Sequence, residues 1–209
     1  MTELYGPVPR PVPTDKVTFE EFLAWCDEET WAEWVDGEVR MVSPASRRHQ
    51  GLRDFLAFAL RAFAEARGLG SVLTAPFLMR LPNVPSGREP DLLFVATGHQ
   101  HRLKDTYLDG PADLVVEIVS PESRLRDRGE KFAEYELGGV GEYWLLDPQP
   151  QRADFFRLDV EGRYERVPPD AAGVYRSEVA PGFWLRVDWC WREPLPPVLS
   201  VLRELGVLP

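Results

Sequence analysis

The most regular hydrophobic pattern of the chain lies between Ser46 and Arg67, where apolar residues recur about every 3.6 positions. Gly68 ends this pattern, as glycine commonly does after the last turn of a helix. A shorter helix is predicted after Thr18, because Thr18 and Glu21 have the spacing of a capping box. The apolar stripe of the longer helix consists of Leu52, Phe55, Leu56, Ala59, Leu60 and Phe63.

The rest of the chain is dominated by patterns that are typical of β-strands. Two runs are almost continuously apolar, as in strands that are buried on both faces. Asp36-Gly37 and Glu161-Gly162 predict hairpin turns. Strands are predicted over 71–81, with a break near Pro76, and over 91–96, 113–119, 142–147 and 184–191. Helices are predicted over 124–137 and 197–205, and turns or loops over 82–90 and 97–110.

This order of elements predicts an α/β (α+β) fold, in which helices flank a mixed central β-sheet. The chain has 209 residues and shows no internal repeat or linker, which favours one domain. Residues 1–17 are punctuated by proline and are predicted to form an extended N-terminal arm.

Composition narrows the class of protein. Hydrophobic residues make up 44% and aromatic residues 11% of the chain, which excludes a disordered protein. The net charge of −10 argues against a general nucleic-acid binder, although it allows a local basic groove. Cys26 and Cys190 match no zinc or redox spacing. With neither a signal peptide nor a membrane span predicted, the expected location is the cytoplasm.

Two carboxylates stand out in the predicted sheet. Asp91 opens a strand directly after Pro90, and Glu117 lies within an apolar run. Consecutive strands tend to be neighbours, so the two side chains are expected near one point of the sheet. The alternative for Asp91, taken alone, is an aspartate at the edge of a strand. The alternative for Glu117 is a glutamate on a half-exposed strand face. Val115 and Val119 share that face, however, and a buried carboxylate needs a partner or a metal ion.

The helix predicted after Glu117 carries an unusual number of cations. Asp127, Lys131 and Tyr135 are spaced by four residues and therefore lie along one helical face. A charge run of this kind is usually a solvated surface. Lys131 is singled out because a lysine beside a carboxylate pair can act there as a point charge. Tyr135 is expected to be a structural partner in the wall of the site.

Several motifs follow one another in a fixed order along the chain. They are Glu33-Trp34-Val35-Asp36-Gly37-Glu38, Ser43-Pro44 with His49, Arg88-Glu89-Pro90-Asp91, the segment from Val116 to Ser123, and Asp127, Lys131 and Tyr135 followed by Gly139-Val140 and the segment from Glu142 to Pro148. Together they resemble the Uma-type putative restriction endonucleases, a branch of the PD-(D/E)xK nuclease superfamily. The resemblance implies a restriction-endonuclease-like core over residues 18–150, with extra strands in residues 151–209 as a β-rich extension of the same domain.

The resemblance also implies a metal site. Asp91, Glu117 and the backbone carbonyl of Ile118 would bind Mg²⁺, with Mn²⁺ as a substitute, because magnesium prefers oxygen ligands. The reaction would be hydrolysis of a phosphodiester bond in DNA by a water that the metal activates. The superfamily pattern places a lysine two residues after the acid, where this chain has Val119. In this branch the lysine has moved to the next helix, which fits Lys131.

Glu33 resembles an additional acid that some superfamily members bring from an N-terminal element. The alternative is a solvated strand residue close to the Asp36-Gly37 turn.

Cations beside these elements are candidates for binding phosphate. A rim of positive charge is expected around the acidic pair, because DNA is a polyanion and the chain as a whole is negative. His49 lies at the start of the long helix, where anions are favoured, although a plain surface histidine is the alternative. The phosphate-binding candidates are His49, Arg47, Arg48, Arg124 and Arg128, and Arg53 and Arg126 are expected to complete the rim.

These observations favour a Mg²⁺-dependent DNA endonuclease that acts as a homodimer, so that two strands can be cut. A catalytically weak nucleic-acid-binding or scaffold protein with the same fold is the first alternative, and the negative net charge favours it slightly. A second alternative is an enzyme in which Asp91 and Glu117 form a metal-free acid–base pair, for instance on glycosides.

Overall fold

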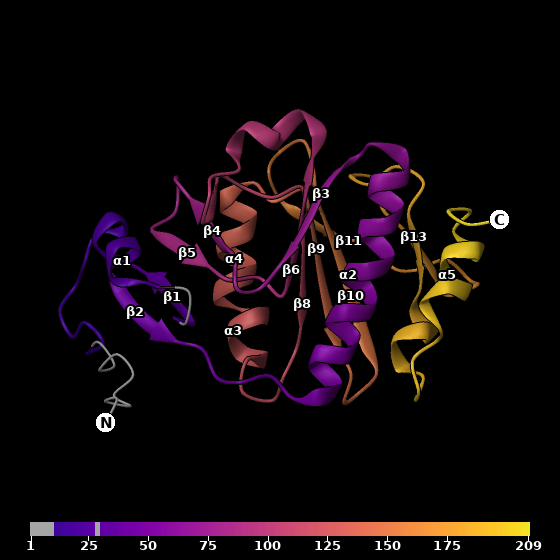
Figure 1. Cartoon of the computed structure of the whole chain (residues 1–209), viewed down its shortest axis with the longest axis horizontal. Helices are drawn as coiled ribbons and strands as arrows, with labels where there is room; N and C mark the ends of the chain where they lie inside the picture. The colour runs from indigo at the N-terminus through magenta and orange to yellow at the C-terminus, as the bar shows by residue number, and fades with distance from the viewer. Residues whose placement is uncertain (1–10, 28–29) are drawn as a thin grey trace, which may run out of the picture.

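A six-stranded sheet forms the centre of the computed structural model, which describes residues 11–27 and 30–209 (Figure 1). Neighbouring strands are antiparallel except for β8 and β9, which are parallel, so the sheet is mixed. In order across the sheet, the strands are β11 (Tyr164–Arg166), β10 (Arg152–Leu158), β9 (Glu142–Asp147), β8 (Leu114–Ile118), β6 (Leu92–Ala96) and β3 (Gly70–Thr74).

A second sheet of five strands is built from the N-terminal half of the chain. The β1–β2 hairpin forms one edge, and its turn lies at Asp36-Gly37, where both residues have positive φ angles. The strands in order are β2 (Glu38–Met41), β1 (Ala32–Val35), β5 (Ser86–Arg88), β4 (Leu78–Leu81) and β7 (Tyr107–Asp109). A separate pair is formed by β12 (Val174–Arg176) and β13 (Trp184–Arg186).

Helices cover both faces of the central sheet, as Figure 1 shows. On one face, α2 and α5 pack with alternate side chains of the strands, such as Phe94 and Val116, in the largest hydrophobic cluster. On the other face, α4 and the second sheet pack against Val115 and Tyr143. The helices are α1 (Phe19–Trp25), α2 (Arg47–Arg67), α3 (Arg124–Arg128), α4 (Glu130–Gly138) and α5 (Val198–Glu204), with 3-10 helices η1 (Thr97–Arg102) and η2 (Val187–Trp191).

The predicted fold class is confirmed, since helices flank mixed sheets of α+β type. The long helix and its ends are confirmed as well: Ser46 caps α2, and Gly68 follows it with a φ of 63°. The capping box of Thr18 and Glu21 is present at α1. The domain boundaries at residues 17 and 150 stay predictions, and residues 1–10 of the predicted arm lie outside the described residues.

Other expectations were wrong in detail. The break predicted near Pro76 is present, but the two parts of the predicted strand 71–81 are separate strands, β3 and β4, which belong to different sheets. The helix predicted over 124–137 is divided at Gly129, whose φ of −118° and ψ of −89° are not helical. Two strands, β5 and β7, lie in segments predicted as turns and loops, because pairing within the second sheet stabilises them despite their weak hydrophobic pattern. The last predicted strand continues after β13 as η2, and β12 was not predicted.

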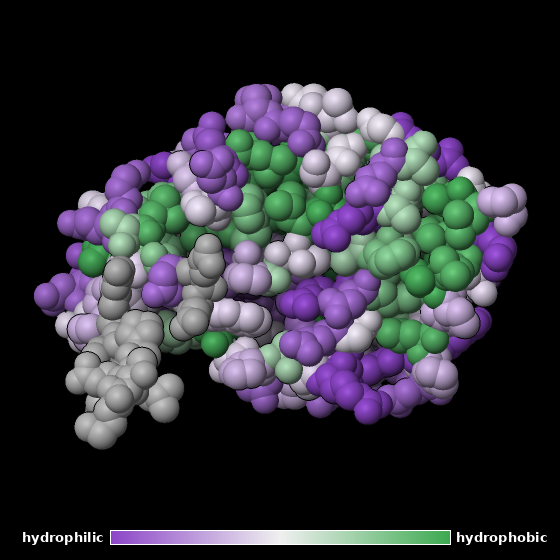
Figure 2. Space-filling model, in the orientation of Figure 1, coloured by the Kyte–Doolittle hydropathy of each residue, from purple (hydrophilic) through white to green (hydrophobic). Residues whose placement is uncertain are grey.

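The C-terminal third is joined to the core through the central sheet. β10 pairs with β9 and so extends the sheet, while α5 packs on α2. Hydrophobic side chains gather on the surface over α2 and α5 (Figure 2). Within residues 11–27 and 30–209, no helix combines the length and the hydrophobicity that crossing a bilayer requires.

Candidate active site

A cleft of about 620 Å³ opens where the two sheets and the start of α2 meet. Among the residues that the structure describes, six carboxylates line it against three cations, so the cleft is rich in negative charge. The charged residues that line it are Glu33 on β1, Glu89 and Asp91 before β6, Glu117 on β8, Glu122 and Asp127 near and on α3, Arg53 on α2, Arg126 on α3 and Lys131 on α4.

Asp91 and Glu117 are brought together by strand register. β6 and β8 are antiparallel neighbours in which Leu92 lies opposite Val116, so Asp91 comes next to the end of β8. The backbone N–H of Ile118 donates a hydrogen bond of 2.7 Å to Oδ2 of Asp91, which fixes the aspartate beside Glu117. The expectation that the two carboxylates lie at one point of the sheet is therefore confirmed.

Glu117 is buried, with 4% of its surface exposed, and it faces α4 rather than solvent. Its Oε1 accepts hydrogen bonds from Lys131 Nζ at 2.8 Å and from the Tyr135 hydroxyl at 3.0 Å. Burial raises the pKa of the Glu117 carboxyl to about 8. The ammonium of Lys131 opposes this rise in pKa, and the carboxylate of Asp91 adds to it. The half-exposed alternative for Glu117 is wrong.

Lys131 lies at the centre of an ion-pair network. Its ammonium is 2.8 Å from Glu117, 3.1 Å from Glu33 and 3.9 Å from Asp127, and only 3% of its side chain is exposed. Burial lowers the pKa of Lys131, but the three carboxylates outweigh it and hold the pKa well above its usual value. The lysine is therefore a permanent cation here, and the solvated-helix alternative does not apply to it.

The spacing of Asp127, Lys131 and Tyr135 keeps these three side chains on one side even though Gly129 interrupts the helix. Tyr135 donates to Glu117 from a fully buried position, as expected for a structural partner in the wall. Asp127 accepts a hydrogen bond from the Ser123 hydroxyl. Burial raises the pKa of the Asp127 carboxyl, although Lys131 opposes the shift.

Glu33 is also buried, with 2% of its surface exposed, so the alternative of a solvated strand residue is wrong. Its Oε2 accepts a hydrogen bond of 2.9 Å from Arg88, and its Oε1 lies 3.1 Å from Lys131. Burial acts to raise the pKa of Glu33, but the charges of Lys131 and Arg88 outweigh it and hold the pKa at about 2. Glu33 is a stable anion between two cations.

The comparison with known proteins adds the family. The family model described as "Putative restriction endonuclease", Uma2, matches residues 19–188, most of the chain. This chain belongs to the Uma2 family. Membership supports a nuclease function and implies a nucleic-acid substrate. No curated protein matches the chain.

A solved structure has the same fold as this Uma2 protein. The crystal structure of a putative nuclease belonging to DUF820 from Anabaena variabilis superposes with a TM-score of 0.67. The match covers 82% of this chain and 96% of the other, at 17% sequence identity. At this level of identity, the likeness establishes the fold.

The donor set of this Uma2 cleft fits a divalent cation. Restriction-endonuclease-like families generally use divalent metals. Asp91 Oδ2 and Glu117 Oε1 are taken up by protein hydrogen bonds, whereas their second oxygens accept none from the described residues. A cation between them would remove the repulsion that helps to raise the pKa of Glu117. Among the described residues, no group of three or more His, Cys, Asp or Glu is arranged to hold a metal, so water or substrate would complete the coordination.

The backbone of Ile118 borders the cleft, and its N–H is bound to Asp91. Its carbonyl as a metal ligand stays a prediction. His49 lies with Nε2 3.1 Å from Oδ2 of Asp91, and its side chain is 14% exposed, so the plain surface alternative is wrong. Its contact is with the candidate metal ligand, and its role toward phosphate stays a prediction.

The expected convergence of arginines is found only in part. Arg53 and Arg126 line the cleft, whereas Arg47 is exposed and does not. Three others are bound elsewhere in the fold, because they neutralise buried carboxylates or cap backbone carbonyls: Arg48 donates to the carbonyls of Cys190 and Arg192, Arg124 to Asp147, and Arg128 to Asp154.

Some buried polar atoms in this cleft have no hydrogen-bond partner among the described residues. Three buried side-chain polar atoms of the described residues lack a hydrogen-bond partner, and all belong to residues that line it. They are Nδ1 of His49, Nε of Arg126 and Oδ1 of Asp127. Buried polar atoms are normally paired, and exceptions point to a function or to a bound water or ion. The cleft therefore offers three polar atoms that a bound water, ion or ligand could pair with.

Sequence reasoning gave no role to Arg88, although Arg88 belongs to a quoted motif. It is completely buried and binds Glu33, Glu130 and Glu134. The segment from Pro82 to Pro90 lacks a hydrophobic period, so no pattern placed Arg88 on a strand. Its position three residues before Asp91 was the only available signal.

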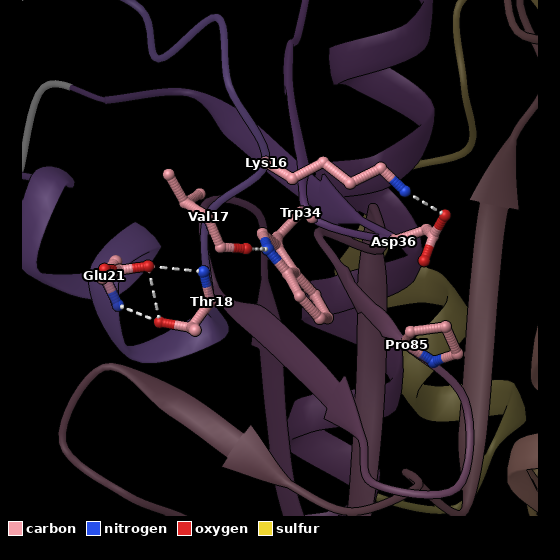
Figure 3. Close-up of a pocket in the computed structure, with 8 residues that line it drawn as sticks. Lys16, Val17, Thr18, Glu21, Trp34, Asp36 and Pro85 are labelled. Atoms are coloured by element: carbon pink, nitrogen blue, oxygen red, sulfur yellow. Dashed lines mark hydrogen bonds and ion pairs between the residues drawn. The ribbon is translucent and has the colours of Figure 1, made fainter.

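A second cavity of about 360 Å³ lies beside the β1–β2 hairpin (Figure 3). The polar groups drawn there bind one another: Lys16 pairs with Asp36 at 2.6 Å, Glu21 with Thr18 in the capping box, and the Trp34 indole with the carbonyl of Val17. These contacts hold α1 on the hairpin, and every polar side chain labelled in Figure 3 takes part in one.

Proposed function

We propose that this chain is a Mg²⁺-dependent endonuclease that hydrolyses phosphodiester bonds in DNA, with Mn²⁺ as an alternative cofactor. The observation that carries the proposal is the contact of 2.8 Å between Lys131 and Glu117 at the bottom of the cleft, next to Asp91. Two acids can hold a divalent cation, and a lysine beside them can orient a water, so this set of groups suits metal-assisted hydrolysis of a phosphodiester. Membership of the Uma2 family supports this chemistry.

In this proposal, Asp91 and Glu117 hold the cation, with the Ile118 carbonyl as a further ligand. Bound Mg²⁺ supplies a Lewis acid that stabilises negative charge on the phosphate. Lys131 stays protonated, so it acts as a fixed positive charge that orients the attacking water by hydrogen bonding. Burial and three carboxylates keep its ammonium at one position, which is the precondition for orienting a nucleophile.

Phosphate groups of DNA would enter the cleft past Arg53 and Arg126. Both line it, and Nε of Arg126 is among its unpaired buried atoms. A role of Arg47 at phosphate remains part of the proposal, for DNA that extends beyond the cleft. Arg48, Arg124 and Arg128, which bind groups elsewhere in the fold, are assigned no phosphate contact. A homodimer in the cytoplasm would bring two such clefts to the two strands.

The scaffold alternative has an observation in its favour. The chain carries a net charge of −10, and carboxylates outnumber cations in the cleft, which weakens affinity for a polyanion. In contrast, the nuclease family argues against a metal-free acid–base pair that acts on glycosides.

A plasmid assay tests the proposal. Supercoiled plasmid is incubated with the protein and Mg²⁺, Mn²⁺ or EDTA, and with the Glu117→Gln variant. Nicking that needs the metal and is lost in Glu117→Gln is expected. A matched control is Glu142→Gln, because Glu142 is an equally buried glutamate on the adjacent strand β9 and does not line the cleft. DNA binding without any metal-dependent nicking would support the scaffold instead.

A further inference from the structure

Both oxygens of the Glu33 carboxylate are already taken up by protein groups. Oε2 accepts from Arg88 at 2.9 Å. Oε1 lies 3.1 Å from the Lys131 ammonium and also accepts a long hydrogen bond of 3.4 Å from the backbone N–H of Glu89. With only 3% of the side chain exposed, Glu33 has little access to any further partner.

Arg88 ties this arrangement to the helix that carries Lys131. Its guanidinium is fully buried and binds Glu33 on one side. On the other side, it donates to Glu134 at 2.6 and 2.8 Å and to Glu130 at 3.3 Å, both on α4. The hydroxyl of Ser86, also on β5, donates to Glu134 at 2.6 Å. Strand β5, strand β1 and helix α4 are thus linked through one arginine.

Lys131 is held between two carboxylates as a result. An oxygen of Glu117 lies 2.8 Å from the ammonium and an oxygen of Glu33 lies 3.1 Å from it. A lysine side chain is flexible and loses considerable rotamer freedom when it is fixed. Two anions at hydrogen-bond distance restrict the ammonium far more than one would, and the side chain is buried as well.

The same arrangement makes Glu33 a poor metal ligand. A divalent cation at Glu33 would stand against the positive charges of both Lys131 and Arg88, which already neutralise this carboxylate. Asp91 and Glu117 differ, because each keeps one oxygen without a hydrogen bond from the described residues.

We infer that Glu33 is a positioning residue: together with Arg88, it holds the Lys131 ammonium against Glu117, and it does not bind the metal. This inference rests on the proposed function and assigns Glu33 a different role from that of the additional catalytic acid which the sequence resemblance suggests. Arg88 then acts indirectly: it holds Glu33, which contacts Lys131, and it binds Glu134 on α4, the helix that carries Lys131.

Calorimetric titration with Mn²⁺ tests the inference without any cleavage. The Glu33→Gln variant is expected to keep the Mn²⁺ affinity and stoichiometry of the wild type, whereas Glu117→Gln loses Mn²⁺ binding. A Glu33→Gln variant with weakened Mn²⁺ binding or a lower stoichiometry would make Glu33 a ligand and overturn the inference.

Kinetics of plasmid nicking test the positioning role. Glu33→Gln is expected to lower kcat by about 10²-fold with KM for DNA unchanged, because a misplaced catalytic group costs about that much. In a Lys131→Met background, the same substitution should cause no further loss, since its effect passes through the lysine. An additional loss in that background would show that Glu33 acts by another route.

If Glu33→Gln does not fold, a crystal of the wild type soaked in Mn²⁺ decides the question. Anomalous density bonded to Asp91 and Glu117, with none bonded to Glu33, is the expected result, and density at Glu33 would refute the inference. A wild type that binds Mn²⁺ in this way but never nicks DNA would instead reject the proposed function.

Discussion

The Lys131 ammonium and the Glu117 carboxylate lie 2.8 Å apart, although 14 residues and the break at Gly129 separate them in the chain. Val119, at the position where the superfamily pattern has lysine, is packed in an apolar cluster and 2% exposed. The α4 helix crosses this side of the sheet, so a cation from α4 reaches the same carboxylate that a lysine on the strand would reach. The contact explains how the chain keeps a lysine beside the acid without the usual spacing.

Replacing Glu117 by Gln is expected to leave the protein at least as stable as the wild type at pH 8. Burial raises the pKa of this carboxyl to about 8 even though Lys131 opposes the shift, so ionising it costs free energy in the folded state. That cost appears as pH rises above the ordinary value near 4.5 and is complete above pH 8. Urea unfolding at pH 5 and pH 8 measures it: Glu117→Gln should gain relative to the wild type at the higher pH.

Glu142→Gln provides the contrast for this measurement. The Glu142 carboxylate accepts hydrogen bonds from the Trp144 indole at 2.9 Å and from the backbone N–H of Glu178 at 2.6 Å. Changing it should lower the free energy of unfolding by about 1–3 kcal/mol, because a buried hydrogen bond is lost. If Glu117→Gln is destabilised as much as Glu142→Gln, Glu117 serves the fold as a buried hydrogen-bond acceptor, as Glu142 does.

Replacing Lys131 by Met should have the opposite effect on stability. The ammonium is the shared partner of Glu117, Glu33 and Asp127, and its loss leaves uncompensated charge in the interior. Breaking a buried pair in this way costs about 3–5 kcal/mol, so thermal unfolding should begin at a clearly lower temperature. A Lys131→Met variant as stable as the wild type would mean that the carboxylates are neutral in the folded protein.

Much of this fold follows from local pattern. The sequence pattern predicts the helical period of α2 and its start at Ser46, the hairpin turn at Asp36-Gly37, and the buried apolar runs of β8 and β9. The division between two sheets is not predictable in this way: Pro76 indicates a break between β3 and β4, but tertiary pairing decides which sheet each strand joins. Strand β5 is held by pairing on both sides and carries no hydrophobic period of its own.

Those residues of the candidate site could be predicted whose residue type is unusual for its place in the sequence pattern. A glutamate between valines on one strand face indicated a buried carboxylate, and helical spacing indicated Lys131. The partners of charged side chains were not predictable, since they depend on which elements meet in space. Arg124 pairs with Asp147 and Arg128 pairs with Asp154. Arg88 lies at the centre of a buried network of ion pairs.

Acid should unfold the protein partly through Glu33. Burial acts to raise the pKa of this carboxyl, but Lys131 and Arg88 hold it at about 2, below the ordinary 4.5. Ionised Glu33 therefore stabilises the fold above pH 4.5, and this contribution is lost as pH falls toward 2. The shift corresponds to about 3 kcal/mol. Measured by urea unfolding, Glu33→Gln should be less stable than the wild type at pH 7, and the difference should shrink between pH 4.5 and 3. A constant difference over that range would mean that the charge of Glu33 contributes nothing.

DNA binding should depend on the arginines of the cleft rather than on those bound elsewhere. Arg53 and Arg126 line the cleft, whereas Arg124 pairs with the buried Asp147 at 3.1 Å and does not line it. Each phosphate contact contributes about 0.9 to the slope of log affinity against log salt concentration. Fluorescence anisotropy with a labelled duplex, in Ca²⁺ so that no cleavage occurs, gives this slope. Replacing Arg53 and Arg126 together by Ala should reduce the slope by about 2, and Arg124→Ala, the matched control, should leave it unchanged. The reverse pattern, in which only Arg124→Ala reduces the slope, would place the phosphate backbone outside the cleft and remove the link between DNA binding and the acidic pair.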